Sequence, residues 1–230
     1  MAEIDRFKFE DKDFDFPFYN KNPYIPKWGW IVLFVALIIG MGLTFSNNLF
    51  ILVLGSLVLI LPLLYFLKWD YNAVVRNLSL RDIALVIALF VGYLVYAILM
   101  QAILNQFGIF GASVPPESVS AYSFVELIFA MIGEELMKFI PFLFLLRVLY
   151  KYTSNRKLSV IVSVAIIIIF FACLHAYSPI MLIFAILVQC FGSLFEFYGY
   201  LKTKNLLVSF LVHYLSDAFL FLMMIFGINL

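Results

Sequence analysis

Charged residues are scarce in this sequence, and their scarcity decides the class of protein. Only 13% of the 230 residues are Asp, Glu, Lys or Arg, whereas 65% are hydrophobic. Soluble domains carry about 25% charged and about 45–50% apolar residues. The mean hydropathy of +1.07 points the same way. We therefore expect an integral, multi-pass protein of the cell membrane, with the lipid bilayer as its first partner.

Other features are missing, and each excludes a class of site. The two cysteines, Cys173 and Cys190, both lie in apolar runs, so we predict small buried thiols and neither a disulfide framework nor a Cys-x-x-Cys metal site. The sequence has no basic patch with interleaved aromatics, which argues against a nucleic-acid partner. Residues 1–27 lack the apolar core and cleavage site of a signal peptide. We predict that they form a cytoplasmic or interfacial N-terminal arm.

Long apolar stretches dominate what remains. A membrane-crossing helix needs roughly 17 to 25 apolar residues, and the sequence offers seven such segments. They are Trp28–Phe45, Leu49–Leu67, Ile83–Leu104, Ser123–Leu146, Leu158–Tyr177, Pro179–Leu201 and Leu206–Ile228. The fold class is therefore predicted to be all-α, a transmembrane helix bundle formed by residues 28–230 as one domain.

The positions of Lys and Arg predict the orientation of the bundle. With seven spans, all the basic residues but one fall in the N-terminal arm or in connections on the same side of the membrane. Basic residues accumulate on the cytoplasmic side, so the N-terminus is predicted to be cytoplasmic and the C-terminus to lie outside. The exception is Lys138, which lies inside the fourth span.

Lys138 has two acidic neighbours in that span, Glu134 and Glu135. Charged groups at mid-membrane are costly, by roughly 2.5–3.5 kcal/mol each on insertion scales, and usually serve a function. Successive helix residues diverge by about 100°, so the two carboxylates face different neighbours, while Lys138 can pair with either. The triplet fits a buried ion pair between helices, or a general base that takes a proton from water.

Two histidines lie in other spans. His175 stands at the end of the fifth span and can be a satisfied interfacial residue or a ligand. His213 and Asp217 are four residues apart, so they share one face of the seventh span. There they can converge on a metal ion, a water or an oxyanion, or the aspartate can orient the histidine for packing. One shared site explains all three spans most economically, and its catalytic core would occupy about residues 123–221.

The order of these residues resembles a known family. Glu134-Glu135 comes first, Phe171-x-x-x-His175 lies in the next span, and His213-x-x-x-Asp217 follows two spans later. This arrangement resembles the CPBP intramembrane proteases, also called the Abi or type II CAAX prenyl endopeptidase family, over residues 124–221. The resemblance implies that Glu134 or Glu135 activates water and that His175 shares this task or binds metal. It also implies that His213 and Asp217 stabilise the oxyanion or complete a metal site.

The sequence departs from the family pattern at two points. Phe139 occupies the usual arginine position of the first motif, and Lys138 gives Glu-Glu-x-x-Lys instead, similar to the PrsW-type membrane proteases. Asp217 stands where many members have asparagine, and its negative charge favours a metal over an oxyanion hole unless the group is protonated. The acid of the sixth span, Glu196, can pair with Lys138 or line a route for water.

The sequence thus predicts an intramembrane endopeptidase acting on a membrane-associated protein or peptide. Prenylated CAAX tails and anchored regulatory proteins are both compatible substrates. Zn²⁺ held by His175, His213 and Asp217 would give a metalloprotease, and a glutamate-dependent enzyme needs no cofactor. Two other classes remain open. A proton- or ion-coupled transporter would carry similar buried charges, although we find no repeated half, and a non-catalytic scaffold or immunity protein could use the same fold.

Overall fold

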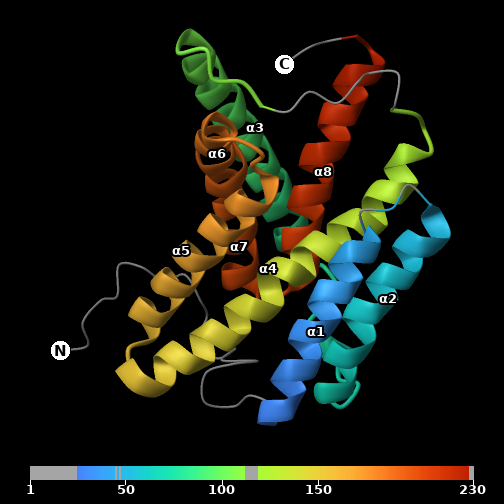
Figure 1. Ribbon diagram of the computed structural model, residues 1–230, viewed down its shortest axis with the longest axis vertical. Coiled ribbons are helices and arrows are strands. Elements are labelled where there is room, and N and C mark those ends of the chain that lie inside the picture. The colour runs from blue at the N-terminus through green and yellow to red at the C-terminus, as the bar shows by residue number, and fades with distance from the viewer. Residues whose placement is uncertain (1–24, 45, 47, 112–118, 228–230) are drawn as a thin grey trace.

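The computed structural model describes residues 25–44, 46, 48–111 and 119–227. Within them the chain forms seven long helical segments and no strand (Figure 1). The segments are α1 (Lys27–Thr44), α2 (Leu49–Phe66), α3 (Leu80–Gln106), α4 (Ser123–Thr153), α5 (Arg156–His175), the continuous run of α6 (Pro179–Phe184), the π-helix η3 (Ala185–Cys190) and α7 (Phe191–Thr203), and α8 (Leu206–Ile225). A short 3₁₀-helix, η1 (Tyr71–Ala73), precedes α3. The prediction of an all-α bundle with seven helices is confirmed.

The helices begin where short polar side chains interrupt the apolar runs. Asn48, Ser79, Asn155, Ser178 and Asn205 are the N-caps of α2, α3, α5, α6 and α8, and each side chain accepts hydrogen bonds from backbone N–H groups of the following turn. Such caps satisfy donors that a helix cannot satisfy itself. The predicted starts of all seven segments lie within three residues of the observed ones, whereas α4 continues to Thr153, beyond its predicted end at Leu146, because the charged residues after Leu146 fall outside the apolar window.

Six of the seven helical segments are long and apolar enough to cross a membrane; the seventh, α4, carries more charge. Their outward faces are apolar, and α3 has only 6% of its most apolar stretch buried inside the molecule. In water such faces would drive aggregation, whereas lipid covers them without cost. The protein is a multi-pass integral membrane protein.

The two cysteines differ in exposure. Cys190 is buried as expected, but Cys173 is exposed on α5, so the prediction of a buried thiol at Cys173 was wrong.

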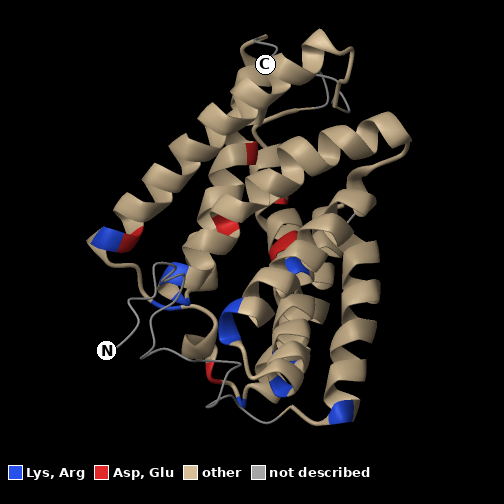
Figure 2. Cartoon of the chain, turned by 90° about the vertical axis from the view of Figure 1, so that its left-hand side faces the viewer, with Lys and Arg blue, Asp and Glu red and all other residues tan. Residues whose placement is uncertain are grey.

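Lys and Arg gather toward one end of the bundle, the end at which α1 begins and away from the C-terminus (Figure 2). This is the distribution that the seven-span topology requires, and the cytoplasmic orientation of this end remains a prediction. Residues 1–24 of the predicted N-terminal arm, residues 1–27, lie outside the described residues. The first helix, α1, begins at Lys27.

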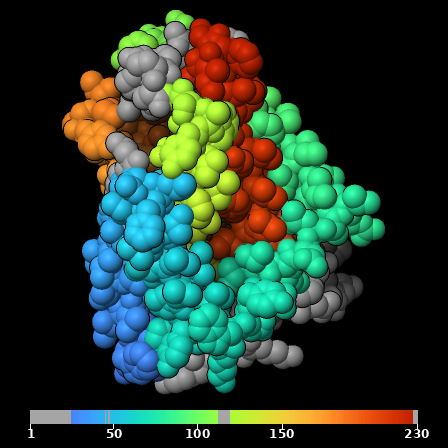
Figure 3. All heavy atoms as spheres, turned by 90° about the vertical axis from the view of Figure 1, so that its right-hand side faces the viewer, coloured from blue at the N-terminus to red at the C-terminus, as the bar shows by residue number. Residues whose placement is uncertain are grey.

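Helix α4 is the centre of the fold. It crosses the bundle obliquely (Figure 1) and packs against α1, α2, α5 and α8. Its first half lies between α2 and α8 on one face of the molecule (Figure 3). Phe142, near its middle, is fully buried in the main core. Charged side chains on α4 therefore face neighbouring helices on several sides rather than lipid alone.

Candidate active site

Four of the predicted site residues converge from three helices. Glu134 of α4 lies between two histidines: its Oε2 atom is 4.0 Å from Nε2 of His175 at the end of α5 and 3.7 Å from Nε2 of His213 in α8. Asp217, one turn beyond His213, places Oδ2 3.8 Å from the same Nε2 atom. These side chains are partly accessible, with 22% of Glu134, 28% of His175 and 30% of Asp217 exposed. We call Glu134, His175, Asp217 and the Nε2 edge of His213 the half-exposed group.

A second set of polar residues lies behind them and is almost fully buried. Lys138 is paired with Glu135, at 2.5 Å between Nζ and Oε1, and with Glu196 of α7. Ser209 of α8 donates a hydrogen bond to Glu135 Oε2 at 2.6 Å. No side chain of the three ionised residues is more than 7% exposed. We call Glu135, Lys138, Glu196 and Ser209 the buried ion cluster.

Lys138 links four helices through one ammonium group. Besides its two carboxylates, Nζ lies 3.3 Å from Nδ1 of His213 and 4.9 Å from the ring centre of Phe171 on α5. A cation over an aromatic face is stabilised by the ring, more strongly where water is excluded. The charge thus has partners on α4, α5, α7 and α8. Of the two pairings open from the sequence, Lys138 uses Glu135.

Both histidines are oriented by hydrogen bonds at Nδ1. His213 Nδ1 lies 2.9 Å from Glu135 Oε1, and His175 Nδ1 lies 2.9 Å from the carbonyl oxygen of Phe171. Since carboxylates and carbonyls accept hydrogen bonds, Nδ1 is the donor in each case. The Nε2 atoms are left facing Glu134. The buried ion cluster therefore holds one ring of the half-exposed group in place, as second-layer partners do in many catalytic sites.

Two groups of these residues contain atoms of the types that bind metal ions, and their surroundings differ. Glu135, Glu196 and His213 offer three ligand atoms within 4.8 Å of one another. The ammonium of Lys138 already lies among them, so a divalent cation there would meet a positive charge at contact distance. This group does not fit a metal. The half-exposed group offers two imidazole Nε2 atoms and carboxylate oxygens, a donor set that zinc accepts, with each ring held through its other nitrogen.

The tilt of α4 explains how the residues meet. By sequence count, Glu134 lies roughly 17 Å from one end of its span and His213 roughly 10 Å from the opposite end of its own, while His175 terminates α5. If the helices ran parallel to the membrane normal, these three residues would lie at different depths in the membrane. Because α4 runs obliquely across the bundle (Figure 1), its middle passes close to both α5 and α8.

Sequence reasoning missed Ser209. It lies four residues before His213, as Asn205 does before Ser209 and Asp217 after His213, so α8 carries one polar stripe at helical spacing. That repeat is present in the sequence and extends the His-x-x-x-Asp pattern toward the start of the helix. Of the two roles that the sequence left open for Glu196, the structure shows the ion pair with Lys138.

Comparison with known proteins gives one match. Residues 116–219 match the family model described as type II CAAX prenyl endopeptidase Rce1-like. Comparisons with curated proteins and with solved structures gave no match. The matched segment contains every residue of the half-exposed group and of the buried ion cluster. The resemblance seen in the sequence is thereby confirmed: residues 116–219 of this membrane protein are similar to the Rce1-like family model.

Proposed function

We propose that this protein is a CAAX-type intramembrane endopeptidase in which Glu134 is the general base. The observation that carries the proposal is the position of Glu134 Oε2, 4.0 Å from His175 Nε2 and 3.7 Å from His213 Nε2, on a side chain that is 22% exposed. Glu135 is the alternative base, but its two oxygens are already engaged by Lys138, His213 and Ser209. A base must reach the proton that it removes.

Water activation follows from the Glu134–His175 geometry. A hydrogen-bonded oxygen lies about 2.8 Å from its acceptor. A water at that distance from both Glu134 Oε2 and His175 Nε2 donates one hydrogen to each, because acceptors 4.0 Å apart subtend roughly a right angle at such a water. Glu134 takes the proton as the water oxygen forms a bond to the scissile carbonyl carbon. The proton is then given to the departing amine nitrogen as the C–N bond breaks.

In this proposal His213 stabilises the negative charge that develops on the carbonyl oxygen. Glu135 lies at Nδ1, while Glu134 and Asp217 lie near Nε2. A ring that carries a hydrogen on each nitrogen donates Nδ1–H to Glu135 and presents Nε2–H to the accessible side. In that form Nε2–H donates to the tetrahedral oxyanion, and Asp217 keeps the ring oriented. Removing one such donor in other enzymes costs about 10²–10³ in rate.

The test is cleavage of a farnesylated peptide with a CAAX ending by the purified protein in lipid vesicles, followed by mass spectrometry. Glu134→Gln preserves the size of the side chain and one acceptor oxygen but removes the basic carboxylate, so the variant should fold normally and lose cleavage by about 10² or more. Glu126→Gln, a change in a carboxylate near the start of the same helix, is the matched control and should retain cleavage. If neither this peptide nor an unprenylated peptide library is cut by the wild type, the proposal fails.

A metal would change this scheme, and chelation tests for it. Zinc would be held by Glu134, His175 and His213, and it would supply a Lewis acid that polarises water. The proposed base and donors act without it, so we expect cleavage to survive dialysis against a chelator. Loss of cleavage on chelation, with recovery on adding Zn²⁺, would show that these side chains are ligands instead.

A further inference from the structure

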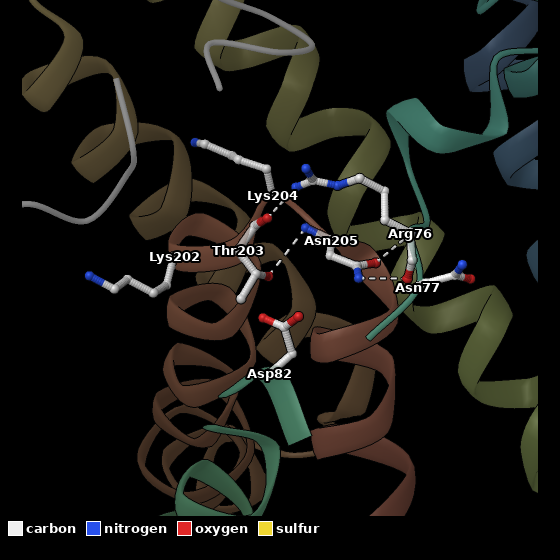
Figure 4. A pocket seen from close by; sticks show the side chains of 7 residues that line it. All are labelled: Arg76, Asn77, Asp82, Lys202, Thr203, Lys204 and Asn205. Carbon is white, nitrogen blue, oxygen red and sulfur yellow. Dashed lines mark hydrogen bonds between the residues drawn. The ribbon is translucent and has the colours of Figure 1, made fainter. Parts of the chain in front are cut away.

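A basic pocket lies at the end of the bundle where Lys and Arg gather, far along α8 from the half-exposed group. Its volume is about 230 Å³, and it lies between the segment that leads into α3 and the turn from α7 to α8 (Figure 4). The residues lining it are Arg76, Asn77, Asp82, Lys202, Thr203, Lys204 and Asn205. Nothing in the proposed peptide hydrolysis uses this pocket.

Hydrogen bonds hold the two walls of the pocket together. The Arg76 guanidinium donates to the carbonyl of Thr203. The buried Asn205 side chain accepts from the Arg76 backbone N–H at 3.1 Å and donates to the Arg76 carbonyl at 2.9 Å. A backbone hydrogen bond from Leu206 to Val74, at 2.8 Å, continues the contact. Figure 4 shows these groups facing one another, so the pocket is built by defined contacts rather than by loose surface chains.

The charge of the lining is strongly positive. Arg76, Lys202 and Lys204 are cationic, and Asp82 is the acidic residue among the seven. The Asp82 carboxylate is turned to its own helix, where Oδ2 accepts from the backbone N–H and the hydroxyl of Ser79, each at 2.8 Å. Lys202 is exposed, whereas Lys204 is buried with its ammonium 5.9 Å from the Tyr200 ring. The pocket therefore presents an excess of positive charge together with neutral polar groups.

The position of the pocket along the helices indicates the kind of ligand that it binds. The pocket lies where α7 ends at Thr203, where α8 begins at Leu206 and where α3 begins at Leu80. Ends of membrane-spanning helices lie at headgroup depth, and basic pockets between such helices bind lipid phosphate groups. About 30 Å³ is the share of one water in the liquid, so the pocket has room for a phosphate group and several waters.

We propose that this pocket binds a phosphate group, supplied by the headgroup of an anionic phospholipid of the adjacent leaflet. The guanidinium and ammonium groups contact the phosphate oxygens, and Thr203, Asn77 and Asn205 provide neutral hydrogen-bonding groups. Bound there, the phosphate joins the α3 side of the bundle to the α7–α8 turn. This site does not depend on the proposed peptidase activity.

The experiment measures lipid binding to the full-length protein in neutral detergent by native mass spectrometry and by thermal unfolding. Phosphatidylglycerol is compared with phosphatidylcholine, and inorganic phosphate forms a third arm. A juxtamembrane lysine contributes enough to lipid binding that its removal weakens affinity by about fivefold. We expect Lys202→Gln to weaken phosphatidylglycerol binding by about that factor and Lys202→Gln with Lys204→Gln to weaken it further.

Controls separate this site from general attraction to basic surfaces. Lys151→Gln changes an exposed lysine at the same end of the bundle, on α4 and outside the pocket, and should leave binding unchanged. Unfolding of each variant without lipid shows whether it folds, and Lys202, being exposed, can be changed alone. If inorganic phosphate stabilises the protein against thermal unfolding only when Lys202 and Lys204 are present, the bound phosphate comes from a soluble source. The proposal would be overturned if Lys202→Gln bound phosphatidylglycerol as tightly as Lys151→Gln does. It would also be overturned if the wild type bound phosphatidylglycerol no more tightly than phosphatidylcholine.

Discussion

The two glutamates of α4 are neighbours in the chain, yet they stand in different environments. Glu135 is 3% exposed and has a cation, an imidazole and a hydroxyl as partners. Glu134 is 22% exposed and faces two imidazole edges at 3.7–4.0 Å. Because the oxygens of Glu135 already contact these partners, they cannot readily take a proton from water. One polar set is therefore closed off by its own ion pairs while the other is accessible at its edge, and His213 contacts both sets.

The buried ion cluster depends on the position of Lys138 in α4. Lys138 is one residue earlier in the helix, and its ammonium reaches Glu196 of α7 as well as Glu135. Two carboxylates around one ammonium leave a net negative charge, which the nearby His213 ring moderates when it is protonated. Each member therefore depends on the others, because an unpaired charge in this interior is strongly unfavourable.

The largest expected effect comes from removing the cation. In Lys138→Met, Glu135 and Glu196 lose their shared partner, and we expect the free energy of unfolding to fall by about 3–5 kcal/mol. Chemical unfolding in detergent measures this. The triple variant Lys138→Met with Glu135→Gln and Glu196→Gln contains no unpaired charge in the cluster and should recover most of the loss. A single Lys138→Met variant as stable as the wild type would mean that the cluster does not hold the helices together.

An intermediate effect should appear when the hydroxyl is removed from the cluster. Ser209→Ala deletes the 2.6 Å hydrogen bond to Glu135 Oε2, and hydrogen bonds to charged groups contribute about 1.5–3 kcal/mol. We expect a stability loss in that range, measured by the same unfolding method. Ser216→Ala, in which the lost hydrogen bond is to the helix's own backbone at Val212, is the matched control with a smaller loss. Equal losses in the two variants would show that Ser209 has no special role.

The smallest effect is expected for a conservative change of Asp217, the acidic residue next to His213 in the half-exposed group. Asp217→Asn keeps the size of the side chain that lies 3.8 Å from His213 Nε2 and one of its oxygens, and removes only the negative charge. Cleavage should then remain within roughly threefold of the wild type, a change of less than about 1 kcal/mol in the barrier. Asp217→Leu, which removes the acceptor, should cost about tenfold or more. If Asp217→Asn is as damaging as Asp217→Leu, the negative charge itself is required, which would favour a metal ligand over an orienting group.

Much of the architecture is determined by the sequence alone. Apolar runs of membrane-spanning length, interrupted by Asn and Ser caps, fix the seven helices because both signals are local. The four-residue spacing of His213 and Asp217 likewise places them on one helix face, whatever surrounds them. The family resemblance adds the order of the polar residues over the segment that matches the Rce1-like model, residues 116–219.

Only the tertiary structure decided which of these residues meet. By sequence, either Glu134 or Glu135 could pair with Lys138 of the same helix. The packing of α4 against α5 and α8 brings Glu134 to the Nε2 atoms of both histidines and leaves Glu135 with Lys138. The contact between Lys138 and Glu196 joins residues 58 positions apart. Such contacts depend on the tilt and rotation of whole helices, which are set by packing against neighbours and not by the local spacing of residues.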